Sequence, residues 1–310
     1  MEGFEINPIN KKGAETPEVT EPKVQEPAGA QETNPISNIH GLSAEELNDV
    51  NKIRITISDT AAPVIVLFGP ASCGKTMTMV RLSRYLQGQG YQLIPDRSFR
   101  PSYDQNYKNL CDNFSSIVNS DDAASRTDNI SFMLVKVVKE GRTICQILEG
   151  PGELYFDPNK ANQDWPTYVH YLLNNTSLRK VFLPFVEPNF GEEETRRNYV
   201  STINQLKQNT DKQKYVFLYN KIDKTPFVIS PGKVHLNHAK HQVEVDYPGI
   251  FARFKNLNPI TSLWRPEDFD FVPFQTGTYT QPTSGSLVYI QGSDRYPQIL
   301  WETLMHCIRG

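Results

Sequence analysis

The chain has 310 residues, of which 38% are hydrophobic and 22% charged, and its 32 basic and 35 acidic residues give a formal net charge of -3. This length and apolar content suffice for one large α/β domain or two small ones with a buried core. The near balance of charges excludes a broad basic surface for nucleic acid or for an anionic membrane. No apolar run approaches the roughly 20 residues that span a bilayer, and the N-terminus lacks the apolar stretch of a secretory signal.

Cysteine usage points to a reducing compartment. The cysteines are widely scattered and form no CxxC pair, which argues against a disulfide framework and against a structural zinc site. Together with the absence of a signal and of an apolar span, this predicts a cytoplasmic protein with no membrane span and no nucleic-acid partner. The four cysteines are Cys73, Cys111, Cys145 and Cys307.

Residues 1–42 are predicted to form a disordered leader, and residues 43–310 a single folded domain. The leader is rich in Glu, Pro and Thr, and its apolar residues are isolated, so it buries too little surface to offset the entropy of ordering. Ser43 and Glu46 have the spacing of a capping box, which predicts a short helix at the start of the folded part.

Two predicted strands and a helix follow. Residues 52–58 alternate Ile with polar neighbours, a pattern typical of a half-buried strand near a sheet edge. Residues 64–68 are apolar throughout, which favours a central parallel strand buried on both faces. A glycine-rich turn leads into a helix predicted over residues 76–86, whose apolar side chains recur on one face.

The segment 90–129 is polar and irregular, with one helix predicted over residues 107–118. Two strands are predicted at residues 130–138 and 143–148. The Glu140-Gly141 dipeptide between them favours a tight antiparallel hairpin.

Strands and helices alternate over the rest of the chain, which predicts a mainly parallel sheet covered on both faces. Pro184 falls inside one of these strands, an awkward position for a central strand because proline donates no ladder hydrogen bond. Strands are predicted at residues 180–186, 215–219 and 269–274, and helices at residues 165–173, from residue 192, and at residues 297–308.

The strongest chemical signal is the segment from Gly69 to Thr76, which matches the phosphate-binding pattern GxxxxGK[ST] between a buried strand and a helix. Its glycines let backbone amides wrap a phosphate, and the helix N-terminus adds partial positive charge. Lys75 is placed to reach the terminal phosphates, and the Thr76 hydroxyl to ligate Mg²⁺. Cys73 precedes the helix N-terminus, a position that favours a lowered thiol pKa, although loop packing without a redox role is the simpler interpretation. The nucleotide-binding candidates of this loop are Gly69, Ser72, Cys73, Gly74, Lys75 and Thr76.

The tetrapeptide Asn220-Lys221-Ile222-Asp223 follows a predicted strand directly, at the end of the strand where α/β sheets bind ligands. The carboxylate of Asp223 can accept two hydrogen bonds, from the ring N–H and the exocyclic amine of guanine. Adenine lacks this donor pair and would leave the carboxylate unpaired. Asn220 is expected to brace the loop, and the stem of Lys221 to lie over the base.

With these motifs, the chain resembles the Ras-like, translation-factor-related (TRAFAC) class of P-loop GTPases from Ile53 to the C-terminus. The resemblance implies a three-layer α/β sandwich of the P-loop NTPase type, with a mainly parallel sheet and one antiparallel hairpin strand. The long gap after the first helix implies an insertion around residues 90–129. The class also implies GTP or GDP and Mg²⁺ as cofactors, and an unidentified effector or regulatory protein as partner.

A third motif, Leu148 to Glu153, falls where this class carries Asp-x-x-Gly followed by Gln. The resemblance implies that Glu149 holds Mg²⁺ through water and that the Gly152 amide senses the γ-phosphate. Glu149 is one methylene longer than the Asp of the class, and Glu153 replaces a Gln that orients the attacking water. The Glu153 charge would sit beside an anionic γ-phosphate, so we expect slow intrinsic hydrolysis.

Three further residues complete the expected site. Thr127 precedes a predicted strand, where the class has a threonine that ligates Mg²⁺ once GTP is bound. Arg126 lies beside it as a candidate arginine finger, although a solvated arginine is the simpler interpretation. Thr276, in the Gln275-Thr276-Gly277 segment, falls where a backbone segment of the class touches guanine.

The predicted function is therefore binding of GTP and its slow hydrolysis to GDP and phosphate with Mg²⁺, as a molecular switch, with Lys75 and Glu153 as catalytic candidates. One alternative is a nucleotide-binding scaffold with negligible hydrolysis, favoured by the two glutamates. The other is an ATP-using P-loop enzyme, against which the Asn220 to Asp223 motif argues.

Overall fold

The computed structural model describes residues 42–120, 132–264, 266–280 and 288–309. The predicted leader lies outside this range except for Leu42, which is buried in the core. Thr127 and Arg126 also lie outside the described residues. The described part of the chain belongs to one compact unit, Pro35–Gly310.

Seven strands form the central sheet in the order β2-β3-β4-β1-β5-β6-β9. All neighbouring pairs are parallel except the two made by β3, which is antiparallel to both β2 and β4. The strands are β1 Val64–Phe68, β2 Gln92–Pro95, β3 Met133–Lys139, β4 Arg142–Glu149, β5 Lys180–Val186, β6 Lys214–Tyr219 and β9 Asp270–Pro273.

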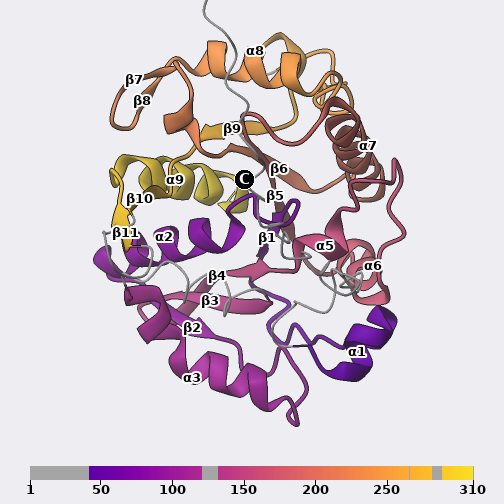
Figure 1. Cartoon of the computed structure of the whole chain (residues 1–310), viewed down its shortest axis with the longest axis vertical. Coiled ribbons are helices and arrows are strands. Elements are labelled where there is room, and N and C mark those ends of the chain that lie inside the picture. Colours follow the sequence, from indigo (N-terminus) through magenta and orange to yellow (C-terminus); the bar gives the residue numbers. More distant parts are fainter. Residues whose placement is uncertain (1–41, 121–131, 265, 281–287, 310) are drawn as a thin grey trace, which may run out of the picture. The chain divides into compact units, whose positions relative to one another are not determined.

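Helices cover both faces of this sheet, with α2 and α9 on one side and α5, α6 and α7 on the other (Figure 1). Their apolar residues account for this placement: Leu300 and Leu304 of α9, for example, recur at helical spacing and are fully buried. The helices are α1 Ala44–Asn48, α2 Lys75–Gly88, α3 Gln105–Asn119, α5 Gly152–Tyr155, α6 Thr167–Asn174, α7 Glu193–Asn209, α8 Leu236–Asp246 and α9 Arg295–Arg309.

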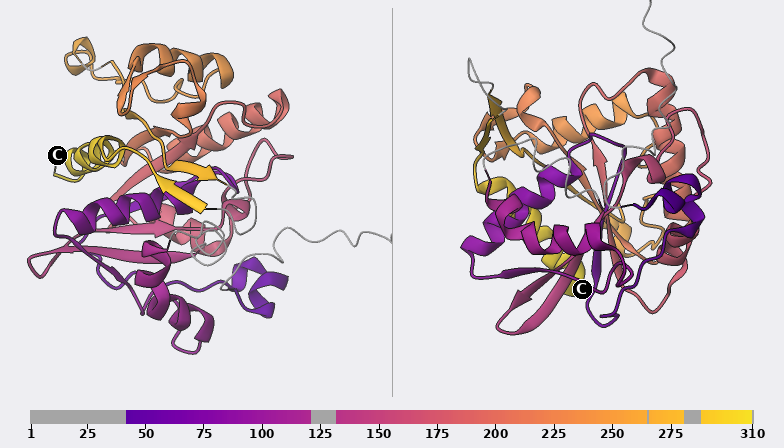
Figure 2. Two further views of the ribbon diagram at one scale, coloured as in Figure 1. Left: turned by 60° about the vertical axis from the view of Figure 1, so that its left-hand side comes forward. Right: turned by 60° about the horizontal axis from the view of Figure 1, so that its bottom comes forward.

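Short elements connect these layers. They are the 3-10 turns η2 Val50–Lys52, η3 Ile222–Lys224 and η4 Thr261–Leu263, and two small antiparallel pairs, β7 Val228–Ser230 with β8 Lys233–Val234 and β10 Gly277–Thr280 with β11 Val288–Gln291. Figure 2 shows both small pairs lying outside the main sheet.

The β3–β4 hairpin confirms the turn predicted from its sequence. Glu140 and Gly141 both have positive φ, 50° and 74°. Two successive residues of this kind form the tight turn whose twist matches the flanking strands. Within the described residues, the hairpin therefore supplies β3, the antiparallel strand of the sheet.

Pro184 lies in a central strand after all. Strand β5 pairs with β1 on one side, where Phe68 faces Pro184 in the register. On the other side, the register with β6 passes from the Phe182–Tyr215 pair to the Phe185–Leu218 pair and skips the proline. The missing N–H therefore falls at an interruption of the ladder, which is how a sheet interior tolerates proline.

The strand predicted over residues 52–58 is wrong. Only η2 reaches into this segment, and the residues after Lys52 form no strand. Ile53 and Ile57 are nevertheless buried in the core, and Thr56 donates one backbone hydrogen bond to Phe99. The alternation of Ile with polar residues thus reflects packing of an extended segment on the core, not pairing in the sheet.

The capping box at the start of the fold is confirmed. The Ser43 hydroxyl accepts from the Glu46 amide, and the Glu46 carboxylate accepts from the Ser43 amide. Glu46 also binds the buried guanidinium of Arg100 at 2.7 Å, and Arg100 reaches Asp104, the N-cap of α3. This ion-pair network ties α1 to the start of α3.

The architecture confirms the predicted fold class, a three-layer α/β sandwich of the P-loop NTPase type with a mainly parallel sheet. Among the residues that the structure describes, no helix is both long and apolar enough to cross a lipid bilayer.

Candidate nucleotide-binding site

The three sequence motifs lie at one edge of the sheet. Gly69 follows β1, Glu149 ends β4, and Asn220 follows β6, and these three strands run parallel. Their carboxyl ends therefore meet at the same edge, the position where open α/β sheets bind ligands.

The loop between β1 and α2 has the backbone of a phosphate cradle. Ser72 and Gly74 both have positive φ, 61° and 91°. A Cβ added at Gly74 would also overlap the side-chain amide of Asn220, so glycine is required there for conformation and for space. The helix α2 begins at Lys75, directly after this loop. The backbone N–H groups at its N-terminus can therefore bind an anion held by the loop.

Lys75 is buried and holds the loop together. Its ammonium group donates to the carbonyl oxygens of Gly69 at 3.1 Å and Pro70 at 2.8 Å. Two of its three N–H donors are thus used within the loop, and the charge is held at the edge of the cradle. The side chain is therefore part of the loop's own packing, as well as a candidate phosphate ligand.

Asn220 joins the phosphate loop to the motif after β6. Its side-chain amide donates to the carbonyl oxygen of Cys73 at 2.9 Å, and its own N–H donates to Val186. The side chain is buried, and its Oδ1 atom has no hydrogen-bond partner among the described residues. Asn220 thus contacts the phosphate loop, and its role toward a base stays a prediction.

Thr76 and Glu149 form the candidate metal site. The Thr76 hydroxyl donates to Glu149 Oε1 at 2.5 Å, while Glu149 Oε2 is buried without a hydrogen-bond partner in the described structure. Burial raises the pKa of the Glu149 carboxyl to about 7, although the Lys75 charge and the Thr76 hydroxyl oppose this.

These atoms fit Mg²⁺. The orphaned Oε2 atom of Glu149 is a hard oxygen ligand held beside the Thr76 hydroxyl, and Mg²⁺ takes one or two such protein oxygens together with phosphates and waters. The described ranges contain no group of three or more His, Cys, Asp or Glu side chains that could hold a metal by itself.

Gly152 abuts the phosphate loop. A Cβ at this position would overlap the backbone of Pro70 and Ala71, lying 2.6 Å from the Pro70 carbonyl oxygen. Gly150 is similarly constrained, because a Cβ there would overlap the hydroxyl end of Tyr155. The segment after β4 thus packs backbone to backbone on the phosphate loop.

Glu153 differs from the other candidates because its side chain is exposed. It lies in the first turn of α5, where a carboxylate suits the positive end of the helix dipole. No hydrogen bond or ion pair involving the side chain is formed within the described residues. It is therefore free to turn toward solvent or toward a ligand at the neighbouring loop.

Lys221 and Asp223 lie at the expected base-binding end. Lys221 has a left-handed backbone, with φ 55°, and its ammonium group forms an ion pair with Glu187, which follows β5. Asp223 lies in η3 with its carboxylate exposed to solvent. The tetrapeptide is anchored between them by Ile222, which is buried and donates a backbone hydrogen bond to Phe274.

Thr276 follows β9 and lies near the Asn220 to Asp223 segment, since Ile222 of that segment is hydrogen-bonded to Phe274. The residue is buried, and its carbonyl oxygen accepts a hydrogen bond of 2.6 Å from the Tyr289 hydroxyl. Tyr289 belongs to β11, so the small β10–β11 pair holds the segment expected to touch guanine.

Two residues at this edge were not predicted from the sequence. Glu187 directly follows the predicted strand 180–186. A polar residue at the carboxyl end of a parallel strand is a candidate site residue, so this position could have identified it. Tyr289 gave no signal, because its link to Thr276 depends on a hairpin that no pattern indicated.

The lowered thiol pKa considered for Cys73 is wrong. The side chain is buried, and desolvation raises its pKa to about 11, with the Lys75 charge opposing only in part. The thiol is therefore protonated at neutral pH, and its role is packing: its Sγ atom would lie 2.9 Å from a Cβ at Gly69.

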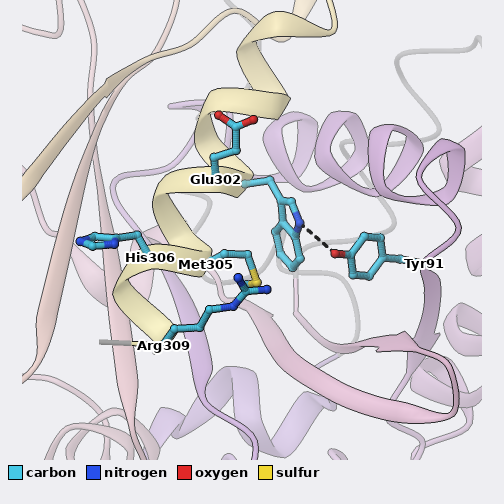
Figure 3. Close-up of a pocket in the computed structure, with 6 residues that line it drawn as sticks. Tyr91, Glu302, Met305, His306 and Arg309 are labelled. Carbon is cyan, nitrogen blue, oxygen red and sulfur yellow. Dashed lines mark hydrogen bonds between the residues drawn. The ribbon is translucent and has the colours of Figure 1, made fainter.

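A separate open cavity of about 480 Å³ lies at the other end of α2 (Figure 3). Tyr91 follows the C-terminus of this 14-residue helix, so the cavity is roughly 20 Å from the phosphate loop. The Tyr91 and Trp301 rings pack edge to face, and the Tyr91 hydroxyl accepts from the Trp301 indole N–H at 3.4 Å. The cavity is lined by Tyr91, Trp301, Glu302, Met305, His306 and Arg309, and by none of the predicted site residues.

The chain was compared with family models, with curated proteins and with solved structures. No family model matches it, and no curated protein matches it. Among solved structures, it is similar to PAB0955, described as a GTPase in apo form, from Pyrococcus abyssi. The two share 12% sequence identity over 80% of this chain and 98% of that chain, with a TM-score of 0.36.

Proposed function

We propose that this chain binds GTP and GDP with Mg²⁺ and hydrolyses GTP slowly, as a molecular switch. The observation that carries the proposal is the hydrogen bond between Asn220 and the Cys73 carbonyl. It links the phosphate-binding loop after β1 to the Asn-Lys-x-Asp segment after β6, at the same edge of the sheet. One nucleotide bound across this link would meet both motifs, with its phosphates at α2 and its base at η3.

The base-binding end supports guanine over adenine. Asp223 offers an exposed carboxylate that can accept from the ring N–H and the exocyclic amine of guanine. The ion pair with Glu187 fixes Lys221 beside it. The Thr276 backbone, held by Tyr289, completes this end of the site.

The phosphate end supports a metal-dependent reaction. Thr76 and Glu149 would hold Mg²⁺, and the bound metal would neutralise charge that develops on the phosphates. Lys75 would bind the terminal phosphates, releasing the carbonyl oxygens of the loop. The Gly152 amide, packed against the loop, would report the presence of the γ-phosphate.

Slow turnover follows from Glu153. A carboxylate at the position of the water-orienting group places a negative charge beside the γ-phosphate, which raises the energy of the reactive complex. The assignment to the Ras-like class, the single domain over residues 43–310 and an effector protein as partner are part of the same proposal.

Calorimetric titration of the nucleotide-free protein with GTP, GDP and ATP, with and without Mg²⁺, tests the proposal. We expect tight binding of GTP and GDP, weaker GTP binding without Mg²⁺, and little binding of ATP. Lys75→Ala should weaken GTP binding severely. Equal affinity for ATP and GTP, or an unchanged affinity in the Lys75 variant, contradicts the proposal.

A nucleotide-binding scaffold without turnover is the second candidate, and the exposed, unpaired state of Glu153 is the observation that favours it. Single-turnover hydrolysis of GTP under saturating Mg²⁺ separates the two. Bound GTP that converts to GDP supports the slow enzyme, and bound GTP that persists supports the scaffold.

A further inference from the structure

Between α8 and β9 the chain forms a projecting loop with four strongly exposed apolar side chains. Leu257, Ile260, Leu263 and Trp264 are 92%, 67%, 77% and 81% exposed, and we call them the apolar tip. The segment from Asn256 to Trp264 contains no charged residue. Exposed apolar groups gathered in this way on a soluble surface mark a site of interaction.

The tip stands on a rigid stem. Lys255 and Glu267 form an antiparallel bridge, and backbone hydrogen bonds join Asn256 to Pro266 at 2.9 Å and Asp268 to Phe254 at 2.7 Å. Phe254 is fully buried, and its ring packs edge to face on Tyr215 and Phe217 of β6. The exposure of the tip is therefore imposed by a fixed base.

Several backbone amides inside the tip are already hydrogen-bonded. The Asn258 amide donates to the Asn256 side chain, the Ile260 amide to the Asn258 side chain, and the Ser262 amide to the Asn258 carbonyl. These amides already have hydrogen-bond acceptors inside the loop, so they lose no hydrogen bond when water is removed. The free-energy cost of moving the loop into a less polar medium is therefore lower.

Positive charge surrounds the stem. Arg253 and Lys255 are exposed and form no ion pair within the described ranges, and Lys212 and Lys214 are exposed at the start of the adjacent strand β6. Two neighbouring carboxylates are already paired, Glu267 with Lys240 and Asp268 with Lys207, so Asp211, exposed beside Lys212, is the acidic group that offsets part of this charge. The near-neutral balance of the whole chain thus conceals a local excess of unpaired cations.

We propose that the apolar tip and these cations bind the surface of a membrane that contains anionic phospholipid. Trp, Leu and Ile would enter the interfacial layer, where Trp is favoured, and the cations behind them would meet the headgroups. All four apolar side chains of the tip are at least 67% exposed, and a fluid lipid layer can cover such side chains without a complementary pocket. A nucleic acid would satisfy the cations but not the aliphatic side chains.

The position of the tip agrees with this role. It precedes β9, at the amino ends of the parallel strands, whereas the nucleotide motifs lie at their carboxyl ends. In the left view of Figure 2 the tip lies on the side where the C-terminal end of α9 is marked. A membrane bound there would leave the nucleotide site facing away.

Flotation of the full chain with phosphatidylcholine vesicles, with and without phosphatidylserine, tests the proposal. Trp264 is its own reporter, because Trp165 and Trp301 are buried. We expect flotation only with phosphatidylserine, a blue shift of tryptophan emission, and quenching by brominated lipid. The measurement needs no nucleotide, so its outcome is independent of the proposed GTP binding.

Two variants and a matched control sharpen the test. One double variant combines Leu263→Ser with Trp264→Ser, and the other combines Arg253→Glu with Lys255→Glu. Each should lower vesicle binding by roughly tenfold or more. Flotation measures binding of the first variant, because that variant lacks the Trp264 reporter. Tyr103→Ser removes an equally exposed apolar side chain, 79% exposed, outside the tip and should leave binding unchanged. All three variants alter exposed side chains, and unchanged unfolding midpoints verify that they fold.

Absence of flotation with both vesicles overturns the proposal, as does binding that survives the Leu263 and Trp264 substitutions. Self-association in sedimentation velocity that these substitutions abolish, without vesicle binding, also overturns it, because the tip would then bind a second copy of the chain.

Discussion

The side-chain amide of Asn220 donates a 2.9 Å hydrogen bond to the backbone carbonyl of Cys73, 147 positions earlier in the chain. Both groups are buried, and Gly74 leaves the space that the Asn220 amide occupies. A motif expected to read the base is thereby fastened to a motif expected to bind phosphates. The contact makes the two ends of the site one rigid unit.

Asn220→Ala should weaken both binding and folding. It leaves the Cys73 carbonyl buried without this donor, which costs about 1–3 kcal/mol of the free energy of unfolding. We expect GTP affinity to fall by roughly tenfold or more, measured by calorimetry, with unfolding followed in denaturant. Asn198→Ala removes a side-chain bond to Pro158 in an exposed setting and serves as the control. Unchanged GTP affinity in the Asn220 variant would show that the link is not part of the site.

Gly152→Ala should disrupt the contact between the segment after β4 and the phosphate loop. The new methyl group would overlap the backbone of Pro70 and Ala71, which cannot yield as a flexible side chain can. A loss of about 1–3 kcal/mol in the free energy of unfolding is expected, together with weaker GTP binding. Gly88→Ala is the matched control, since a Cβ there meets nothing within 4 Å, and it should be neutral or slightly stabilising. Equal effects of the two substitutions would contradict the packing argument.

The nucleotide-free protein should lose stability as the pH rises, because of Glu149. Its folded-state pKa of about 7 lies above the ordinary value of 4.5, so the folded chain binds the proton more tightly than the unfolded chain. This contribution is fully present below about pH 4.5 and is lost as the pH rises through 7, a change of up to about 3 kcal/mol.

The measurement for Glu149 is the free energy of unfolding in denaturant, compared between wild type and Glu149→Gln across this pH range. The comparison matters because Glu46 and Asp96, whose pKa values are lowered by hydrogen bonds and cations, lose stabilisation as the pH falls below their ordinary values. The difference between the two proteins should vary with pH only through Glu149. A constant difference from pH 5 to pH 8 would refute the raised pKa.

Glu153→Gln should raise single-turnover GTP hydrolysis if the charge of Glu153 hinders the reaction. The exposed carboxylate has no packing role, so the fold should be unaffected. Glu194→Gln, in the first turn of α7, changes an equally exposed helix-start carboxylate and should leave the rate unchanged. A drop of tenfold, about 1.4 kcal/mol of barrier, would instead identify the carboxylate as the group that orients water.

Asp223→Asn tests base specificity. The substitution replaces an acceptor-only carboxylate by an amide with one acceptor and one donor, and the new donor faces the exocyclic amine of guanine. Xanthine has a carbonyl oxygen at that position and suits the amide. GTP should therefore lose several kcal/mol relative to xanthosine triphosphate in competition binding. Asp211→Asn, at the opposite edge of the sheet, is the control. Retained preference for GTP in the Asp223 variant would mean that this segment is an ordinary loop.

Local patterns were sufficient for much of the fold and for proposing where the candidate site lies. The unbroken apolar run of β1 favours a strand buried on both faces, and the Glu140-Gly141 pair favours a tight turn. Both preferences depend only on residues that are adjacent in the sequence. The phosphate loop and the Asn220 to Asp223 segment were found for the same reason, because each lies next to a strand that the pattern also indicates.

Other features were decided by tertiary structure alone. The segment 52–58 carries strand periodicity, yet it finds no partner strand and packs on the core instead. The β10–β11 pair and its Tyr289 hydrogen bond to Thr276 left no local trace. Burial and pairing of this kind depend on which distant residues the topology brings together.

The chemistry of the site depends on the same long-range contacts. The sequence alone identified Lys75, Glu149 and Lys221 as candidates, but it did not identify the groups that they contact. These are the Gly69 carbonyl for Lys75, the Thr76 hydroxyl for Glu149 and the Glu187 carboxylate for Lys221. A residue type is a local fact, whereas desolvation, ion pairing and the resulting pKa depend on every group that folding places around it.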